Sequence, residues 1–297
     1  MEAIQLGSIF QVGKNHLKKK ILCQDRAVEI EKDGLIIIIL SDGMGSYKYT
    51  DLGALFIIDY ITKKAGDIYK VLDAQSFDDN GEPDWTKPDD GKIFAQGFFS
   101  LLRPMEAEAK EYAKKIGTTI DKLHCTLSFA IVGVDKVLAA AIGDSPIWIK
   151  RKSKEGIDVL DGNDGADNGT FSALNPKLAL NYMAVAIFPA SDLQAVLMMS
   201  DGCFGYNKEQ IYDPSGVMDF PDWFYAVTRG ERNLQDTINH LCKKGYDDCS
   251  FAYYLHDITL ERGNHPGMGS DLTSVTRQDT PSSRRDWRQV LRSFRRR

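Results

Sequence analysis

Four aspartates at the ends of short apolar segments constrain the fold of this chain more than any other feature. They are Asp42 after 35–41, Asp144 after 137–143, Asp201 after 195–200 and Asp247 before 251–255. Short apolar runs bounded by turn residues are typical of buried strands. Carboxylates at strand ends can converge on one edge of a sheet, where they repel one another unless a cation lies between them. Because hard divalent cations prefer oxygen ligands, the sequence predicts a metal-dependent hydrolase.

The spacing of apolar residues predicts strands and helices in separate groups rather than in strict alternation. Strands are expected at 4–10, 27–40 with a turn at 32–34, 125–134, 137–150, before Asp201 and at 250–255. Helices are expected at 51–64, 93–116 and 233–244, and loops at 14–20, 73–91 and 161–170. Pro104 should kink or divide the second helix. Antiparallel-looking pairs of strands with helices between the groups indicate an α+β fold.

Composition bears on the compartment more than on the fold. With 297 residues, the chain can form one large domain or two small ones. Its five cysteines are an odd number without a Cys-x-x-Cys pair, which argues against a disulfide framework and a thiolate zinc site. No apolar run approaches the roughly 20 residues that span a bilayer, and no amino-terminal stretch resembles a signal peptide. We therefore expect no transmembrane segment and a cytoplasmic location.

Charge separates the end of the chain from the rest. Residues 263–297 contain eight arginines and three aspartates, a balance of +5, whereas the whole chain carries −5 and the remainder −10. We therefore expect a boundary near residue 261, followed by an Arg-rich, disordered tail at 262–297. Apolar residues at helical spacing between 287 and 294 favour a second interpretation, in which the tail binds an acidic partner, nucleic acid or an anionic membrane surface.

Six short motifs occur in the chain, each beside a predicted strand. They are Gln24-Asp25, Asp42-Gly43-Met44-Gly45, Thr126-Leu127, Gly143-Asp144-Ser145, Ser200-Asp201-Gly202 and Asp247-Asp248. Each is weak evidence alone, because Asp-Gly pairs are common in turns. Their order and spacing together resemble the metal-dependent serine/threonine protein phosphatases of the 2C type, and most closely the compact bacterial branch. The resemblance covers roughly residues 5 to 257.

This resemblance implies both an architecture and a set of ligands. The fold would be two stacked antiparallel β-sheets flanked by helices, a four-layer α-β-β-α sandwich formed by residues 1–261. The cofactors would be two Mn2+ or Mg2+ ions, with a third held more weakly. The implied ligands are Asp42 bridging two ions, the Gly43 carbonyl, Asp201 and Asp247 on the first ion, Asp25 on the second through water, and Asp144 on the third. Asp42, Asp201 and Asp247 are the predicted catalytic residues, and Asp248 is expected to be a solvent-facing neighbour.

Three positions depart from the family's pattern. Met44 stands where many members carry a histidine that can protonate the leaving group, so a metal-bound water would serve as the acid. Lys20 stands where many members place a phosphate-binding arginine, and it lacks the bidentate geometry of that residue. His16 is a second candidate for contact with the substrate phosphate. Pro146 replaces the usual arginine after the Gly-Asp-Ser turn.

The predicted activity is hydrolysis of phosphoserine or phosphothreonine in phosphorylated protein substrates by a metal-activated water, with a role in signalling. Two ions about 4 Å apart lower the pKa of a bridging water and stabilise charge on the phosphoryl oxygens. One alternative is a catalytically weak or inactive phosphatase-fold module that binds a partner or a phosphorylated ligand. A further alternative is a nuclease or small-phosphoester hydrolase with the same acidic cluster.

Overall fold

The computed structural model describes residues 4–45, 47–78, 90–162, 172–174, 182–204, 210–213, 216–244 and 247–256. The predicted tail at 262–297 and most of the predicted loop at 161–170 lie outside these residues, as does the middle of the segment 73–91. Within the described part of the chain, no helix has both the length and the apolar character needed to cross a membrane.

The strands form an antiparallel sheet of nine strands. They are β1 (Ile4–Gln11), β2 (Arg26–Lys32), β3 (Leu35–Ser41), β4 (Leu127–Val132), β5 (Lys136–Arg151), β6 (Ile157–Gly162), β7 (Ala184–Pro189), β8 (Leu193–Met199) and β11 (Cys249–His256). Their order is β1-β11-β8-β5-β4-β3-β2, with β6 and β7 also paired to β5. A separate hairpin pairs β9 (Gln210–Asp213) with β10 (Gly216–Asp219). The mixed α+β class and the antiparallel sheet are thus confirmed.

Strand β5 joins the two arms of this sheet. Its first half pairs with β4 and β7, whereas its second half pairs with β8 and β6. The register shifts between Gly143 and Ile147, and Gly143 has a φ of 95°, a conformation that favours glycine. Asp144 follows directly, so the irregularity in the longest strand places this carboxylate where the arms meet.

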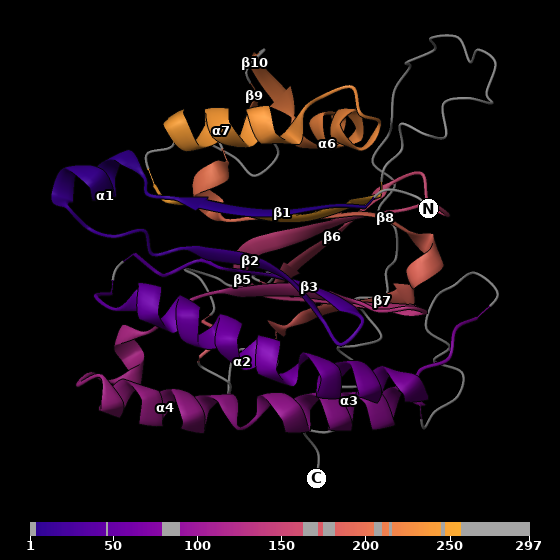
Figure 1. Ribbon diagram of the computed structural model, residues 1–297, viewed down its shortest axis with the longest axis horizontal. Coiled ribbons are helices and arrows are strands. Elements are labelled where there is room, and N and C mark those ends of the chain that lie inside the picture. The colour runs from indigo at the N-terminus through magenta and orange to yellow at the C-terminus, as the bar shows by residue number, and fades with distance from the viewer. Residues whose placement is uncertain are drawn as a thin grey trace.

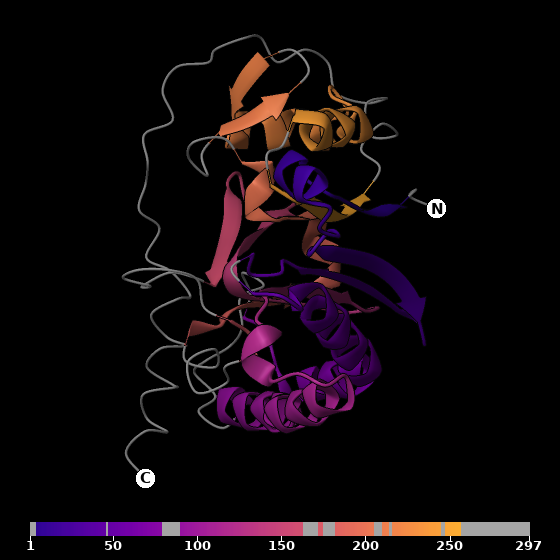
Figure 2. The same ribbon diagram turned by 90° about the vertical axis from the view of Figure 1, so that its left-hand side faces the viewer.

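Helices cover the two opposite sides of the strands (Figure 1). Along one side run α2 (Thr50–Val71), α3 (Asp90–Leu102) and α4 (Met105–Lys115), and along the other α6 (Phe220–Thr228) and α7 (Leu234–Lys244). Four short 3-10 helices complete the described structure: η1 (Leu72–Ala74), η2 (Ile120–Lys122), η3 (Ala190–Asp192) and η4 (Asp201–Cys203). The helix α1 (Lys14–Lys19) lies apart from both groups, at one end of the strands, and faces the viewer in Figure 2.

Alternation along the strands sends side chains into three apolar clusters. In β3, Ile37 and Ile39 pack with the helices α2 to α4, whereas Ile38 and Leu40 enter a cluster formed mainly by strand residues. In β8, Val196 and Met198 enter that same cluster, whereas Leu197 and Met199 pack with α6 and α7. Because successive side chains of a strand point to opposite faces, both strands are buried on both faces. This explains why their sequences are apolar throughout.

The structure confirms one of the predicted element boundaries and differs from the predictions at several other elements. The division at Pro104 is confirmed, because α3 ends at Leu102 and α4 begins at Met105. The predicted helix at 51–64 extends to Val71. The segment 14–20 is wrong as a loop, because residues 14–19 form α1. Helix α6 is not among the predicted helices, since most of its residues are apolar and buried.

Candidate metal centre

The backbone of Asp42 is held by the threonine of the predicted Thr126-Leu127 motif. The Asp42 N–H donates to Thr126 Oγ1 at 2.9 Å, and the Thr126 N–H donates to the Asp42 carbonyl at 2.8 Å. The Ser41 hydroxyl donates to the Thr126 carbonyl at 2.7 Å. Thr126 Oγ1 also lies 3.1 Å from the hydroxyl oxygen of Ser145, the neighbour of Asp144. Two of the predicted acidic motifs are therefore connected through one threonine.

The carboxylates of Asp25 and Asp42 are close together and in an unfavourable environment for charge. Asp25 is 1% exposed, and burial raises its pKa to about 7. The pKa of Asp42 is raised well above its usual range, first by burial and then by the charges of Asp25, Asp201 and Asp144. Three of the predicted ligands therefore lie near enough to Asp42 for their charges to disfavour its ionised form, as expected for a site that holds cations.

The turns that carry Asp201 and Asp247 pack against each other. A side chain on Gly202 would meet the Asp248 carbonyl oxygen at 1.9 Å and Asp247 Cβ at 3.3 Å, so only glycine fits this contact. Ser200 and Ser250 align the two strands, because the Ser200 N–H donates to the Ser250 carbonyl at 3.1 Å and the Ser250 N–H donates to Ser200 Oγ at 2.9 Å. The Asp201 and Asp247 residues themselves are exposed to solvent.

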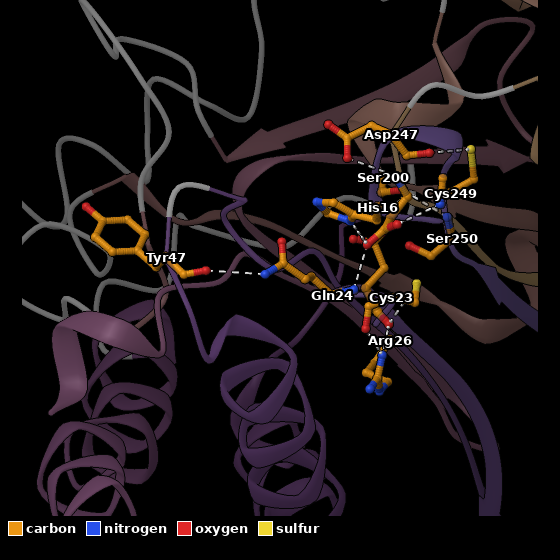
Figure 3. Close-up of polar contacts among 12 residues, drawn as sticks. His16, Cys23, Gln24, Arg26, Tyr47, Ser200, Asp247, Cys249 and Ser250 are labelled. Atoms are coloured by element: carbon orange, nitrogen blue, oxygen red, sulfur yellow. Dashed lines mark hydrogen bonds and ion pairs between the residues drawn. The ribbon is translucent and has the colours of Figure 1, made fainter. Parts of the chain in front are cut away.

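Asp248 is buried, and its prediction as a solvent-facing residue is wrong. Only 3% of it is exposed, and its carboxylate accepts hydrogen bonds from the Gly13 N–H at 2.7 Å and the Gln24 N–H at 2.6 Å. His16 Nδ1 lies 2.9 Å from the same carboxylate. Figure 3 shows the labelled His16 near Asp247 and Gln24. The donor residues are 224 to 235 positions away in the chain, so only the tertiary fold reveals the contact.

One compact set of possible metal ligands is formed by His16, Asp247 and Asp248. Their ligand atoms all lie within 4.8 Å of one another, whereas Asp42 and Asp201 stand outside this set among the described residues. His16 thus lies at the predicted centre, next to Asp247.

The remaining predicted residues occupy different positions. Gly43 follows Asp42 directly and is bridged to Cys125, while the Met44 N–H donates to the His124 carbonyl at 3.1 Å. Lys20 ends α1, is exposed, and adopts a left-handed conformation with a φ of 56°. The structure therefore places Lys20 at the end of α1 with its side chain exposed to solvent.

The donor atoms present fit a divalent metal ion. Asp25 Oδ2 is buried without a hydrogen-bond partner among the described residues. Buried carboxylate oxygens are normally paired, because an unpaired one carries a large desolvation cost. A cation supplies the missing partner, and a set of oxygen donors suits Mg2+ or Mn2+.

A carboxylate cluster at one end of an antiparallel sheet flanked by helices fits a metal-dependent hydrolase. The family model for protein phosphatase 2C matches residues 12–241, and the chain belongs to this family. It is therefore a metal-dependent protein serine/threonine phosphatase. The alternative of a catalytically inactive binding module is not favoured by this match.

Solved structures with a similar fold include bacterial serine/threonine phosphatases. The serine/threonine phosphatase Stp1 from Staphylococcus aureus has a TM-score of 0.54 and 13% identity, with 86% of this chain and 96% of that chain covered. The S. agalactiae serine/threonine phosphatase has a TM-score of 0.52 and 14% identity, over 86% and 100% of the two chains. PppA from Pseudomonas aeruginosa has a TM-score of 0.51 and 15% identity, over 86% and 98%. No curated protein sequence matches the chain.

Proposed function

We propose that this phosphatase removes phosphate from serine and threonine side chains with divalent ions bound at the carboxylate cluster. The observation that carries this proposal is the burial of Asp25 beside Asp42, with an unpartnered oxygen and a pKa raised to about 7. A protein that keeps an acidic pair in this state without a cation loses stability, so the pair is explained best by metal binding.

The proposed ligands are those of the predicted motifs. We place two Mn2+ or Mg2+ ions at the cluster, with a third held more weakly, and the ligands are Asp42, the Gly43 carbonyl, Asp201, Asp247, Asp25 and Asp144. When bound, such ions lower the pKa of water and offset negative charge on a phosphoryl group. Thr126 fixes the backbone of Asp42, and the close fit of Gly202 against Asp247 fixes the relative position of two further ligands.

The substrate phosphate is proposed to contact Lys20 and His16. His16 Nδ1 lies 2.9 Å from Asp248 Oδ2, and this contact fixes the ring orientation and leaves Nε2 for contact with a phosphoryl oxygen. Lys20 contributes a flexible point charge, which neutralises phosphate without the fixed fork of an arginine. Met44 carries no proton to donate, so the leaving alkoxide takes its proton from water.

The finer architecture and location are also proposals. We infer a four-layer α-β-β-α sandwich for residues 1–261, supported by the strand-lined cluster that contains Ile38, Val196 and Ala252. The tail at 262–297 is proposed to lie outside this domain and to bind an acidic partner, nucleic acid or an anionic membrane surface. A cytoplasmic location is also proposed, and the free thiols of Cys23 and Cys125 support a reducing compartment.

The direct test is hydrolysis of a phosphothreonine peptide in the presence of Mn2+, followed by addition of a chelator. We expect turnover that stops with the chelator and that falls by at least about a thousandfold in Asp42→Asn and Asp201→Asn, because each loses a charged ligand. Asp59→Asn is a matched control, because Asp59 is an exposed aspartate on α2. Folding of each variant is checked by circular dichroism. Full activity in folded Asp42→Asn would refute the proposed metal roles.

A substrate panel tests the remaining alternative. The same preparation is assayed with single-stranded DNA, RNA and small phosphoesters at equal concentration. A phosphopeptide should be turned over with the highest kcat/KM, because a protein substrate gains binding energy from residues beyond the phosphate. A preference for nucleic acid would assign the cluster to a nuclease.

A further inference from the structure

The segment 17–22 has an unusual combination of exposed side chains. Leu17 is 57% exposed, Ile21 40% and Leu22 72%, so three of the nine large exposed hydrophobic residues in the described chain fall within six positions. Single exposed apolar residues are ordinary, but a group of this kind marks an interaction surface. Lys18, Lys19 and Lys20 lie between these residues and are also exposed. We call residues 17–22 the docking segment.

The docking segment is fixed to the candidate metal centre at both ends. The Gly13 N–H before it and the Gln24 N–H after it both donate to the buried carboxylate of Asp248. A side chain on Gly13 would meet the backbone of Asp247 at 2.1 Å, so the chain before the segment is pressed against a proposed metal ligand. Leu22 is two residues from Gln24, which limits the separation of their Cα atoms to about 7 Å. The exposed surface is therefore a fixed part of the rim of the site.

The backbone at Lys20 gives independent support. Its φ of 56° lies in the left-handed region, which glycine adopts without strain and other residues rarely occupy. Helices commonly end on a glycine in this conformation. A lysine in this conformation carries backbone strain that a glycine avoids, and such strain is expected where the side chain has a functional role. The strained residue stands in the middle of the docking segment.

We propose that the docking segment binds the part of a phosphoprotein substrate that flanks the phosphorylated residue, and that this part carries acidic and apolar side chains. The proposal rests on the proposed function, because the bound chain is the substrate of that site. Charge complementarity identifies the occupant: residues 1–262 carry a net charge of −10, so the three lysines form a local exception that attracts acidic groups. Leu17, Ile21 and Leu22 supply contacts for apolar groups between them.

The test uses two phosphothreonine peptides and one small substrate. One peptide has Asp, Glu and Leu on both sides of the phosphothreonine, the other has Gly and Ser, and para-nitrophenyl phosphate reports on the chemistry alone. The variants are Leu17→Ser/Leu22→Ser and Lys18→Glu/Lys19→Glu, which leave the proposed phosphate contacts and metal ligands intact. We expect KM for the acidic and apolar peptide to rise about tenfold, which corresponds to 1.4 kcal/mol, with unchanged kcat. Kinetics with para-nitrophenyl phosphate should not change.

Matched controls change the same residue types elsewhere. Val134 is 94% exposed in the turn after β4, at the opposite end of that strand from Thr126, so Val134→Ser controls for loss of an exposed apolar residue. Lys63→Glu/Lys70→Glu controls for reversal of two exposed charges on α2. Both controls should leave KM unchanged for both peptides. A rise in KM in these controls equal to that in the docking variants would overturn the proposal, because the effect would then not depend on where the apolar residue or the charge lies.

A binding measurement separates failure of docking from failure of catalysis. Fluorescence anisotropy is measured with the acidic and apolar peptide carrying unphosphorylated threonine, which needs no turnover. Weaker binding in both docking variants supports the segment even if no peptide is hydrolysed, in which case the proposed catalytic function fails alone. Unchanged binding and unchanged KM overturn the docking proposal. Loss of co-sedimentation with phosphatidylserine vesicles, with unchanged peptide kinetics, would instead assign the segment to a membrane surface and overturn it as well.

Discussion

Both oxygens of the Asp248 carboxylate accept hydrogen bonds inside the protein. Oδ1 accepts from the Gly13 N–H, and Oδ2 accepts from the Gln24 N–H and lies 2.9 Å from His16 Nδ1. Hydrogen bonds to an ionised acceptor are stronger than neutral ones, and a buried carboxylate needs them to offset its desolvation. Asp248 therefore connects the segment before α1, the segment before β2 and the start of β11.

Replacing Asp248 by asparagine tests this connection at the scale of one residue. An amide has one oxygen, so its NH2 group must face one of the two backbone N–H donors. We expect Asp248→Asn to lower the free energy of unfolding by about 2 kcal/mol, because one buried donor is left without an acceptor. Urea denaturation without metal measures this change. Calorimetry should also show weaker Mn2+ binding, since Asp247 and Asp25 are adjacent to the disturbed contacts.

Asp247→Asn is the matched comparison for that measurement. Asp247 is exposed, and its Oδ1 accepts from the Asp248 N–H at 2.9 Å, an interaction that an asparagine keeps. We expect its stability without metal to stay within about 0.5 kcal/mol of the native protein, while Mn2+ affinity falls. Equal stability loss in both variants would contradict the buried role of Asp248.

Residue patterns predict which acidic side chains are ligands, and this stays a prediction, but they do not predict the contacts that support these side chains. Asp42 and Asp201 stand out because each follows a recognisable apolar run, which is a local property of the sequence, whereas Asp25 is indicated only by the Gln24-Asp25 motif of the resemblance. Asp248 has no such signal, since its donors come from positions 13, 16 and 24. Contacts of this range depend on how β1 and β11 pair, which no local pattern specifies.

At the scale of elements, the sequence was informative where burial and periodicity agree. Helices α3 and α4 and strands β3 and β8 have long apolar patterns, and their positions were predicted closely. Strand β7 and helix α6 were missed, because one is short and partly exposed and the other is apolar on most sides. Helix α1 was missed because its six residues are polar and form no buried face. The contacts of Gly13 and His16 with the Asp248 carboxylate, rather than helix propensity, explain why this segment forms a helix.

The end of strand β5 depends on an ion pair with the 3-10 helix η3. Arg151 and Asp192 have side chains 3% and 13% exposed, and Nε lies 2.6 Å from Oδ2. Asp192 also accepts hydrogen bonds from the Ser153 N–H and hydroxyl, each at 2.7 Å. Although burial raises the pKa of Asp192, the hydrogen bonds from Ser153 and the Arg151 charge lower it overall. Asp192 thus holds the end of β5 and the turn before β6 against η3.

Asp192→Ala should destabilise the protein by about 3 kcal/mol, because removal of one partner leaves a buried charge without its counter-ion. The measurement is urea denaturation at pH 7. A lowered folded-state pKa gives stability that is present above the unfolded value and lost as pH falls, so the difference from the native protein should shrink below about pH 4. Asp158→Ala breaks the ion pair of Asp158 with Lys154, whose side chains are both 39% exposed, and should cost less than about 1 kcal/mol. Equal costs at the two positions would contradict the argument from burial.

For the whole molecule, the apolar packing that stabilises the fold conflicts with the negative charge of the buried carboxylates, and a bound cation resolves this conflict. Three apolar clusters pack the two arms of the sheet and the flanking helices. The strands of these layers end at the site, and they carry Asp25 and Asp42 into surroundings where their charged forms are disfavoured. The packing that stabilises the fold therefore also raises the free energy of the ionised site without metal.

This conflict predicts how the stability of the metal-free protein depends on pH. The pKa of Asp25 rises from an unfolded value near 4 to about 7 on folding, so the folded state binds an extra proton between these values. The resulting stability is fully present below about pH 4 and is lost as pH rises through 7. With a chelator present, Asp25→Asn should therefore be more stable than the native protein at pH 8, and the difference should shrink as pH falls to 5. Urea denaturation at each pH measures both proteins. Excess Mn2+ should make the native protein the more stable of the two at pH 8, because the Asp25 carboxylate then binds the cation. Parallel pH profiles of the two proteins in chelator would show that the ionisation of Asp25 does not destabilise the metal-free fold.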